Sequence, residues 1–159
     1  MIKSMLYATD LGAYAPYVMQ HALALARTFS AELYVIHAVE PMGLFAQSVL
    51  ESYLDQPTLN ALHSEGVNTA MDGIEQKVLE TFREELGEGQ DLALIRAVRV
   101  RQGDPAEVIL AQVRQMSVDL VVLGSHCHCQ GSDKPLGRTA AHVLQLAQVP
   151  VYMVPLPKA

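Results

Sequence analysis

The chain has 159 residues and a mass of 17.4 kDa; half of its residues are hydrophobic and 18% are charged. This composition supplies a sizeable core for one globular domain and excludes intrinsic disorder. The 11 basic residues against 17 acidic ones give a net charge of −6, which excludes the basic surface of a general nucleic-acid-binding protein and the polybasic segment of a membrane anchor.

The sequence lacks the signals of membrane insertion and of secretion. No apolar run approaches the roughly 18 residues that cross a bilayer, and the apolar stretch within Met1–Asp10 is too short for a signal peptide. Cys127 and Cys129 lie two positions apart and form no disulfide framework, which favours a reducing compartment. We therefore expect one cytoplasmic domain over residues 1–159, with no membrane and no nucleic acid among its partners.

Strand-like and helix-like runs alternate along the first part of the chain. Residues 2–9 form a short apolar run that stops at Asp10, which predicts a buried strand. A helix is expected from Pro16, because proline suits a first helical turn. Its apolar face has the spacing i, i+4, i+7 and i+11 and consists of Val18, Ala22, Leu25 and Phe29. Residues 31–39 are rich in β-branched and aromatic side chains and predict a second strand.

Residues 40–60 form the one long connection without a regular pattern. Four residues in it have the spacing of a short amphipathic helix: Val49, Leu50, Tyr53 and Leu54. We favour an insertion packed on the domain over a functional lid. A long helix is then expected between Asn60 and Leu86, ended by Gly87 and Gly89. Its apolar stripe is Met71, Ile74, Val78 and Phe82.

The last part of the chain continues the alternation. Residues 95–101 alternate apolar with charged side chains, which predicts a strand with one wet face at a sheet edge. Asp104 has the spacing of a helix N-cap, with Pro105 and Glu107 after it. The core face of that helix is Ile109, Val113 and Met116. The rest of the chain predicts an apolar strand at 120–123, a helix at 139–147 and a strand at 151–154.

This order of elements predicts an α/β fold with an open, doubly wound, five-stranded parallel sheet. Right-handed crossovers give the Rossmann-like strand order 3-2-1-4-5. Ligands of such sheets bind at the carboxyl ends of the strands, where the strand order reverses. There the segment Ala8-Thr9-Asp10 meets the loop at 124–139, and a strand, a glycine-containing loop and a helix N-terminus form a generic anion site. Asp10 is expected either to contact a ligand or to cap the following turn.

Known phosphate fingerprints fail when they are tested literally. No G-x-G-x-x-G follows the first strand, and Gly131 to Gly137 has five intervening residues where the P-loop has four, with Arg138 in place of lysine. Lys134 and Arg138 against Asp133 still give the loop a charge of 2 − 1 = +1. The spacing alone leaves a phosphate site and an ordinary surface loop as alternatives.

Four segments resemble the universal stress protein family in order and spacing along nearly the whole chain. They are the first strand ending in Asp10, then AELYVIHAVE, then GDPAEVIL, and finally DLVVLGSH followed by a loop, a helix and VPVYMV. The resemblance implies the fold predicted above and a homodimer through the C-terminal strand. It also implies one of two branches, of which the ATP-binding one carries G-x-x-G, nine residues, and G-[ST].

This chain matches that nucleotide pattern in part. Gly124 and Gly137 occupy the first and third glycine positions, Cys127 replaces the second glycine, and Arg138 replaces the Ser/Thr, with Thr139 one place later. The nucleotide contacts that the resemblance implies are Ala8, Thr9, Asp10, Ala38, Val39, Leu123, Gly124, Cys127, Gly137, Arg138 and Thr139.

The two departures have different physical consequences. Cys127 adds a Cβ where glycine lets the backbone approach a ligand. Arg138 removes a small hydroxyl but brings a fixed cation with five donors, which suits phosphate. The resemblance is therefore to a member with a degenerate ATP-binding loop. ATP or another adenine nucleotide is the expected cofactor, and a loop that binds none is the alternative.

The run His126-Cys127-His128-Cys129 has metal-ligand residue types. In an extended segment its histidines and cysteines face opposite ways, so the four cannot converge on one ion. We favour a loop with incidental histidines and expect no metal. A two-ligand site completed by His142, and a low-pKa redox thiol, are the alternatives.

These observations predict a regulatory stress-response protein, a homodimer, and not an enzyme. No general base or metal-holding carboxylate pair accompanies the loop, so hydrolysis of ATP would be slow and incidental. Ser125 has Leu123 two places before it, where the nucleophile elbow G-x-S-x-G requires glycine. His21 and His37 are expected to be hydrogen-bonded within the fold or to face solvent. Two alternatives remain: a nucleotide-independent interaction module, and a metal- or redox-sensing variant that uses the His-Cys run.

Overall fold

The computed structural model describes residues 1–40, 52–53, 55–87, 89–125 and 136–156. The described elements, in chain order, are β1 (Ser4–Thr9), α1 (Ala15–Phe29), β2 (Glu32–Val39), α3 (Gln56–Leu86), α4 (Gln90–Leu94), β3 (Ile95–Gln102), α5 (Pro105–Met116), β4 (Leu120–Gly124), α6 (Arg138–Leu146) and β5 (Val151–Val154).

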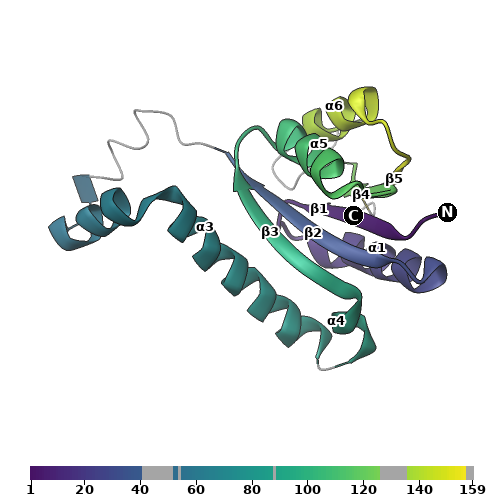
Figure 1. The fold of residues 1–159 in the computed structure, drawn as a ribbon, viewed down its shortest axis with the longest axis horizontal. Coiled ribbons are helices and arrows are strands. Elements are labelled where there is room, and N and C mark those ends of the chain that lie inside the picture. Colours follow the sequence, from purple (N-terminus) through teal and green to yellow (C-terminus); the bar gives the residue numbers. More distant parts are fainter. Residues whose placement is uncertain (41–51, 54, 88, 126–135, 157–159) are drawn as a thin grey trace.

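The five strands form one parallel sheet in the order β3-β2-β1-β4-β5, which confirms the predicted fold class and strand order. Helices α1 and α3 cover one face, and α5 and α6 cover the other (Figure 1). Although α3 has 31 residues, neither it nor another helix in the described ranges is apolar enough over a sufficient length to span a membrane.

The two faces of the sheet carry two separate cores. Met5 and Tyr7 of β1 point to the α1 face, whereas Leu6 between them points to the α5 face, and all three are fully buried. The strand period of two thus divides one strand between both cores. Burial of each such side chain contributes about 1.5–3 kcal/mol, so the pairing of β1 within the sheet is strongly specified.

Helix α1 begins as predicted, with Pro16 in its first turn, but its buried face differs from the predicted one. The buried residues are Val18, Met19, Ala22, Leu23 and Ala26. Phe29 is 41% exposed, and Leu25 is only partly buried. Val18 and Ala22 belong to both the predicted and the observed face, but the observed face continues through Leu23 and Ala26, so Leu25 and Phe29 lie at its margin.

Other boundaries also differ from the sequence expectation. Helix α3 begins at Gln56, so the irregular connection is shorter than predicted; of its four predicted helical residues, Tyr53 is helical and exposed and the others lie outside the described residues. Helix α4 has five residues and was not predicted. Asp91 in α4 forms an ion pair with Arg27 of α1, which attaches this short turn to the neighbouring helix. Helix α6 begins at Arg138, one residue before the predicted start.

The predicted cap of α5 is confirmed. Asp104 Oδ2 accepts a hydrogen bond of 3.2 Å from the backbone N–H of Glu107, three residues later. This satisfies one of the amides that a helix N-terminus leaves without a partner. Ile109 and Val113 of this helix are buried as predicted, whereas Met116 is partly buried.

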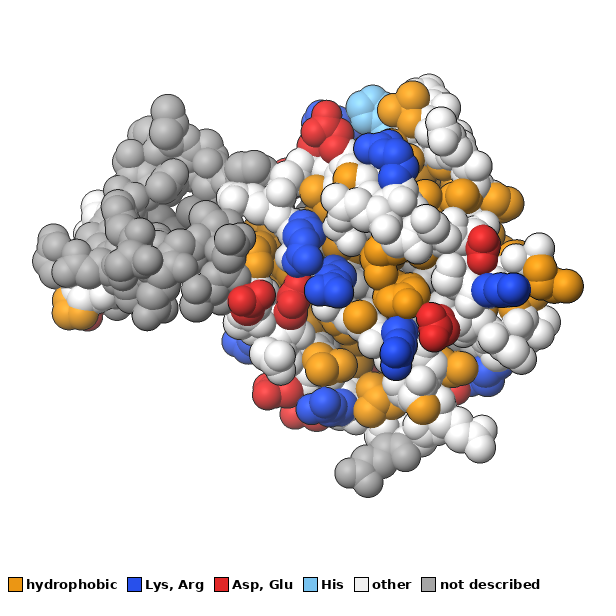
Figure 2. Space-filling view, in the orientation of Figure 1, with side chains coloured by type: hydrophobic (Ala, Val, Ile, Leu, Met, Phe, Trp, Pro, Cys, Tyr) orange, Lys and Arg blue, Asp and Glu red, His pale blue; other side chains and the backbone are white. Residues whose placement is uncertain are grey.

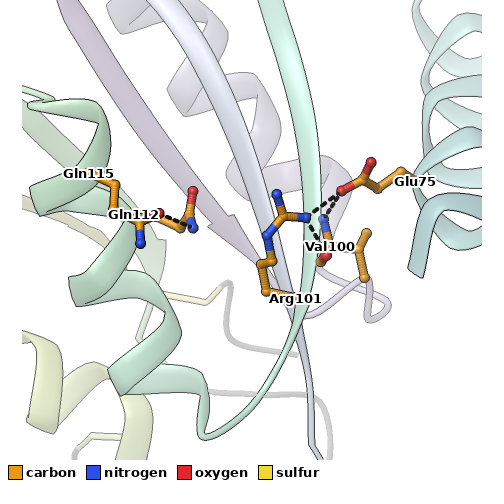
Figure 3. A network of polar contacts seen from close by, with 5 residues as sticks. All are labelled: Glu75, Val100, Arg101, Gln112 and Gln115. Atoms are coloured by element: carbon orange, nitrogen blue, oxygen red, sulfur yellow. Dashed lines mark hydrogen bonds and ion pairs between the residues drawn. The ribbon is translucent and has the colours of Figure 1, made fainter. Parts of the chain in front are cut away.

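The edge strand β3 is protected by a side chain of α3. Glu75 Oε1 accepts a hydrogen bond of 2.8 Å from the backbone N–H of Val100 and one of 2.9 Å from Arg101 Nη1 (Figure 3). The carboxylate thus occupies a position that another strand would use to extend the sheet. On the face shown in Figure 2, basic and acidic side chains are interspersed and form no continuous basic patch among the residues described.

Loss of the Glu75 charge is expected to destabilise the protein. Glu75→Gln keeps the shape of the side chain but weakens both hydrogen bonds, so the free energy of unfolding should fall by about 0.5–1.5 kcal/mol. Glu80→Gln is the matched control, because Glu80 is exposed on the same helix and should change stability by less than about 0.5 kcal/mol. Urea unfolding measures both; equal midpoints for the two variants would contradict the role of Glu75.

Asp119 joins the amino ends of β1 and β4. Its Oδ2 accepts hydrogen bonds from the backbone N–H of Lys3 at 2.8 Å and of Ser4 at 3.1 Å. The bond from Lys3, followed by that from Ser4, lowers the pKa of the Asp119 carboxyl below its usual value. The carboxylate form is therefore the one that the folded chain favours.

This lowered pKa predicts part of the acid sensitivity of the fold. A carboxyl group whose pKa is lower in the folded than in the unfolded chain stabilises the folded state. This contribution is complete at a pH above the unfolded-state pKa, and it is lost as the pH falls through the folded-state pKa. Asp119→Asn should lower the melting temperature at pH 7, and the gap to the unmodified protein should narrow below about pH 4. Asp72→Asn, an exposed change on α3, should show no such narrowing; a constant gap for Asp119→Asn would refute the assignment.

Candidate functional site

A cleft of about 360 Å³ lies at the carboxyl edge of the sheet, around the ends of β1, β2 and β4 and the starts of α1, α5 and α6. The chain leaves β1 towards one face of the sheet and leaves β4 towards the other, so the two strand ends diverge and a crevice forms between their connections. Its size is that of a small-molecule site.

Most of the predicted contact residues meet in this cleft although they are far apart in sequence. The predicted residues that line it are Ala8, Thr9, Asp10, Ala38, Leu123, Gly124, Gly137, Arg138 and Thr139. Val39 is absent from this lining; its carbonyl accepts a hydrogen bond of 3.0 Å from Gly103 N–H. Cys127, like the whole His126–Cys129 run, lies outside the described residues. Ligand contact by any of these residues stays a prediction.

The turn after β1 is built from its own polar side chains. Thr9 Oγ1 accepts a hydrogen bond of 3.0 Å from Leu11 N–H, and Asp10 Oδ1 accepts one of 2.8 Å from Gly12 N–H. Leu11 has a φ of 57°, in the left-handed region, which these two bonds hold in place. Asp10 therefore has the turn role that was one of its two predicted alternatives.

His37 connects the ends of β2 and β1 on the wall of the cleft. Its Nδ1 lies 2.9 Å from the carbonyl oxygen of Thr9. Because a carbonyl only accepts, Nδ1 carries the proton and donates. The interpretation of His37 as a satisfied histidine agrees with this contact. His21, on α1, is also partnered, with Nδ1 3.1 Å from the hydroxyl of Tyr152.

Tyr7 forms part of the floor of the cleft. Its side chain is 1% exposed, and its hydroxyl donates a hydrogen bond of 3.0 Å to the carbonyl of Ala15 in the first turn of α1. Burial raises the pKa of the Tyr7 phenol far above its usual value. The phenol is thus a neutral structural group that fixes α1 on β1, and it is unsuited to acid–base chemistry near neutral pH.

The base of the β4–α6 connection is held by backbone hydrogen bonds. Gly137 N–H donates to the carbonyl of Ser125 at 2.8 Å, and Ser125 N–H donates to the carbonyl of Val154 at 2.9 Å. The end of β4, the start of α6 and the end of β5 are therefore tied at one point. Gly137 has a φ of −68°, which any residue adopts, so the backbone conformation alone does not require glycine there.

The charges around the cleft come from a few residues. Arg138 is the one Lys or Arg among the described lining residues, and Asp10 and Glu40 are the acids. Arg138 Nη2 lies 3.9 Å from Asp104 Oδ1, and the Arg138 side chain is 79% exposed. The first turns of α5 and α6 both reach the cleft, through Pro105 and Thr139. Helix N-termini offer amide donors and a positive dipole end to an anion.

Several lining residues were not predicted as contacts. They include Tyr14, His37, Glu40, Pro105, Ser125 and Leu156. Pro105 carries a usable signal, because every helix that follows a strand of a parallel sheet starts at the carboxyl edge. Leu156 carries none, because it follows β5 and reaches the cleft only through tertiary packing. Among the described residues no group of three His, Cys, Asp or Glu side chains is arranged to hold a metal, and the expectation of no metal stays a prediction.

The strand order and the position of the cleft define a Rossmann-like α/β domain with a cleft at the reversal point of the sheet. The family model described as "Universal stress protein family" matches residues 1–155. The chain belongs to the universal stress protein family.

Individual relatives match this chain over nearly their whole length. The chain is 22% identical over 157 residues to universal stress protein MJ0577 of Methanocaldococcus jannaschii, covering 97% of this chain and 95% of the relative. The solved structure of MJ0577 matches with a TM-score of 0.71 at 21% identity, covering 100% and 99% of the two chains. UspA from Lactobacillus plantarum matches with a TM-score of 0.64 at 20% identity, covering 96% and 97%.

A further solved structure is described as a universal stress protein in complex with cAMP. It matches with a TM-score of 0.57 at 15% identity, covering 96% of each chain. At these identities the structural matches show a shared fold.

Proposed function

We propose that this protein is a regulatory nucleotide-binding protein of the cytoplasm, and that its ligand is ATP or another adenine nucleotide bound in the cleft. One observation carries the proposal: residues from β1, β2, β4 and α6 that the family pattern associates with nucleotide contact line the same cleft. The cAMP complex of a family relative supports an adenine nucleotide as the ligand class.

The described residues suit such a ligand at both of its ends. Asp10, at the end of β1, offers a carboxylate to the hydroxyl and amine donors of an adenosine. The first turn of α6 and the Arg138 guanidinium offer donors and positive charge to phosphate. Apolar side chains such as Ile36, Ile109 and Leu123 line the same cleft and provide a surface for the base.

We propose binding without efficient turnover. We expect no general base or metal-holding carboxylate pair in the loop after β4, because the acids described in the cleft lining, Asp10 and Glu40, follow β1 and β2. Phosphoryl transfer relies on such groups to orient the nucleophile and hold Mg²⁺. The bound nucleotide would then act as a regulatory ligand. The alternative function is an interaction with a protein partner that does not depend on nucleotide. A finding that no nucleotide binds would favour this alternative.

Calorimetric titration with ATP, cAMP and adenosine tests the proposal. We expect the unmodified protein to bind an adenine nucleotide, and Arg138→Ser to weaken ATP binding by about 1.5–3 kcal/mol, the range for hydrogen bonds to charged groups. Asp10→Asn, which retains an acceptor for the turn, should weaken adenosine and ATP alike. Analysis of what the purified protein releases on heat denaturation is a second readout. Absence of binding in the unmodified protein, with no released nucleotide, would overturn the proposal.

We also propose that the protein is a homodimer that pairs through β5. This strand is the edge opposite β3. Its Tyr152 is 37% exposed, and Val151 and Met153 are only partly buried. Two copies related by a two-fold axis would satisfy each other's edge, whereas in the β3 edge the backbone N–H of Val100 already donates to Glu75.

The dimer proposal predicts the effect of a charge in β5. Val151→Lys should shift the protein towards monomer, because it places a charge in the edge strand that each copy would pair with the other. Phe29→Lys, at an exposed apolar position at the end of α1, is the matched control and should leave the assembly unchanged. Light scattering after size-exclusion chromatography at micromolar concentration gives the mass; a monomeric unmodified protein would contradict the proposal.

A further inference from the structure

The ion pair between Arg138 and Asp104 joins the starts of two helices at the mouth of the cleft. Arg138 is the first residue of α6, and Asp104 is the N-cap of α5. Arg138 Nη2 lies 3.9 Å from Asp104 Oδ1. The one described cation of the cleft lining is therefore already directed towards a carboxylate of the protein itself.

The position of Asp104 is rigidly determined. Its Oδ2 accepts the cap bond from Glu107 N–H, which leaves Oδ1 towards Arg138. The preceding residue, Gly103, has a φ of 151°, and a Cβ there would lie 2.9 Å from Val108 Cγ2. Gly103 N–H also donates to the carbonyl of Val39 at 3.0 Å. The carboxylate is thus held by the backbone, and Arg138, 79% exposed, is the partner that is able to move.

Resting on the proposed function, we propose that Asp104 sets how strongly this cleft distinguishes adenine nucleotides by their phosphate charge. Asp104 holds the guanidinium of Arg138, so the phosphates of a bound nucleotide compete with it for the same donors. An exposed pair of this length is weak, and a phosphate with several charged oxygens displaces the carboxylate from it. Asp104 acts through Arg138 and is in this sense a positioning residue.

The competition between Asp104 and phosphate for Arg138 should weaken the binding of ATP relative to adenosine. Asp104 also repels phosphate directly, at a helix N-terminus that otherwise attracts anions. Both effects reduce the advantage of ATP over adenosine, and both disappear when the carboxylate becomes an amide. Asparagine remains a good N-cap, so the α5 start retains its hydrogen bond while the negative charge is lost.

The experiment measures the affinity of Asp104→Asn for adenosine, AMP and ATP by calorimetry. We expect ATP to bind roughly three- to tenfold more tightly than to the unmodified protein, AMP to show a smaller gain, and adenosine to change by less than about twofold. In an Arg138→Ser background the gain of Asp104→Asn for ATP should be smaller, because no guanidinium is released there. Melting temperature is recorded for each variant, and Asp104→Ser, a neutral cap, replaces Asp104→Asn if the latter does not fold.

Glu107→Gln is the matched control. Glu107 is exposed in the first turn of the same helix and, like Asp104, lies outside the cleft lining. The ion pair of Arg138 is with Asp104 rather than Glu107, so the ratio of ATP to adenosine affinity should stay within about twofold. An equal gain for Glu107→Gln would overturn the inference, because net charge alone would then explain it. The inference would also be overturned if the unmodified protein binds ATP and Asp104→Asn leaves the ratio of ATP to adenosine affinity unchanged. Absence of nucleotide binding by the unmodified protein would instead overturn the proposed function, and this inference with it.

Discussion

The parallel pairing of β1 with β4 is the interaction on which the rest of the structure depends. Met5 to Ala8 of β1 pair in register with Leu120 to Leu123 of β4. The chain then continues from β1 into α1 on one face and from β4 into α6 on the other. This divergence creates the crevice, and it places the first turn of α6 beside the turn that follows β1. Without that pairing, the lining residues of β4 and α6 would not lie beside those of β1 and β2.

The polar groups around the crevice first serve the fold. Thr9, Asp10, His37 and Ser125 all accept or donate bonds that hold the ends of strands or the turn after β1. A ligand would therefore meet the side chains of Thr9, Asp10 and His37 in positions that the fold already holds, which lowers the entropy that binding must offset. Arg138 differs from them, because it is exposed and its partner is another charged side chain.

The sequence predicts the architecture more fully than the details of its contacts. The alternation of strands and helices, with the handedness of their crossovers, was enough for the strand order, which the structure confirms. The buried face of α1 was predicted in part: Val18 and Ala22 are buried as expected, whereas Met19, Leu23 and Ala26 were missed and Leu25 and Phe29 lie at the margin of the buried face. Helix α4 escaped prediction because five residues are too few to show a helical period.

The candidate site could be predicted where a residue's position follows from the end of a strand. Ala8, Thr9 and Gly124 are of this kind, and all line the cleft. Val39 is one residue beyond Ala38, and the alternation of a strand turns it away from the position that Ala38 occupies. The Arg138–Asp104 pair could not be predicted, because it depends on how α5 and α6 lie relative to each other rather than on either sequence segment.

The protection of β3 by Glu75 limits the size of any assembly that the sheet can build. A sheet with two open edges adds copies at both ends and grows into a fibre. In this chain the carboxylate of Glu75 from α3 holds the backbone N–H of Val100 in the β3 edge, so a strand that added at this edge would have to displace it. A side chain far from the cleft thus makes growth of the sheet at this edge less favourable.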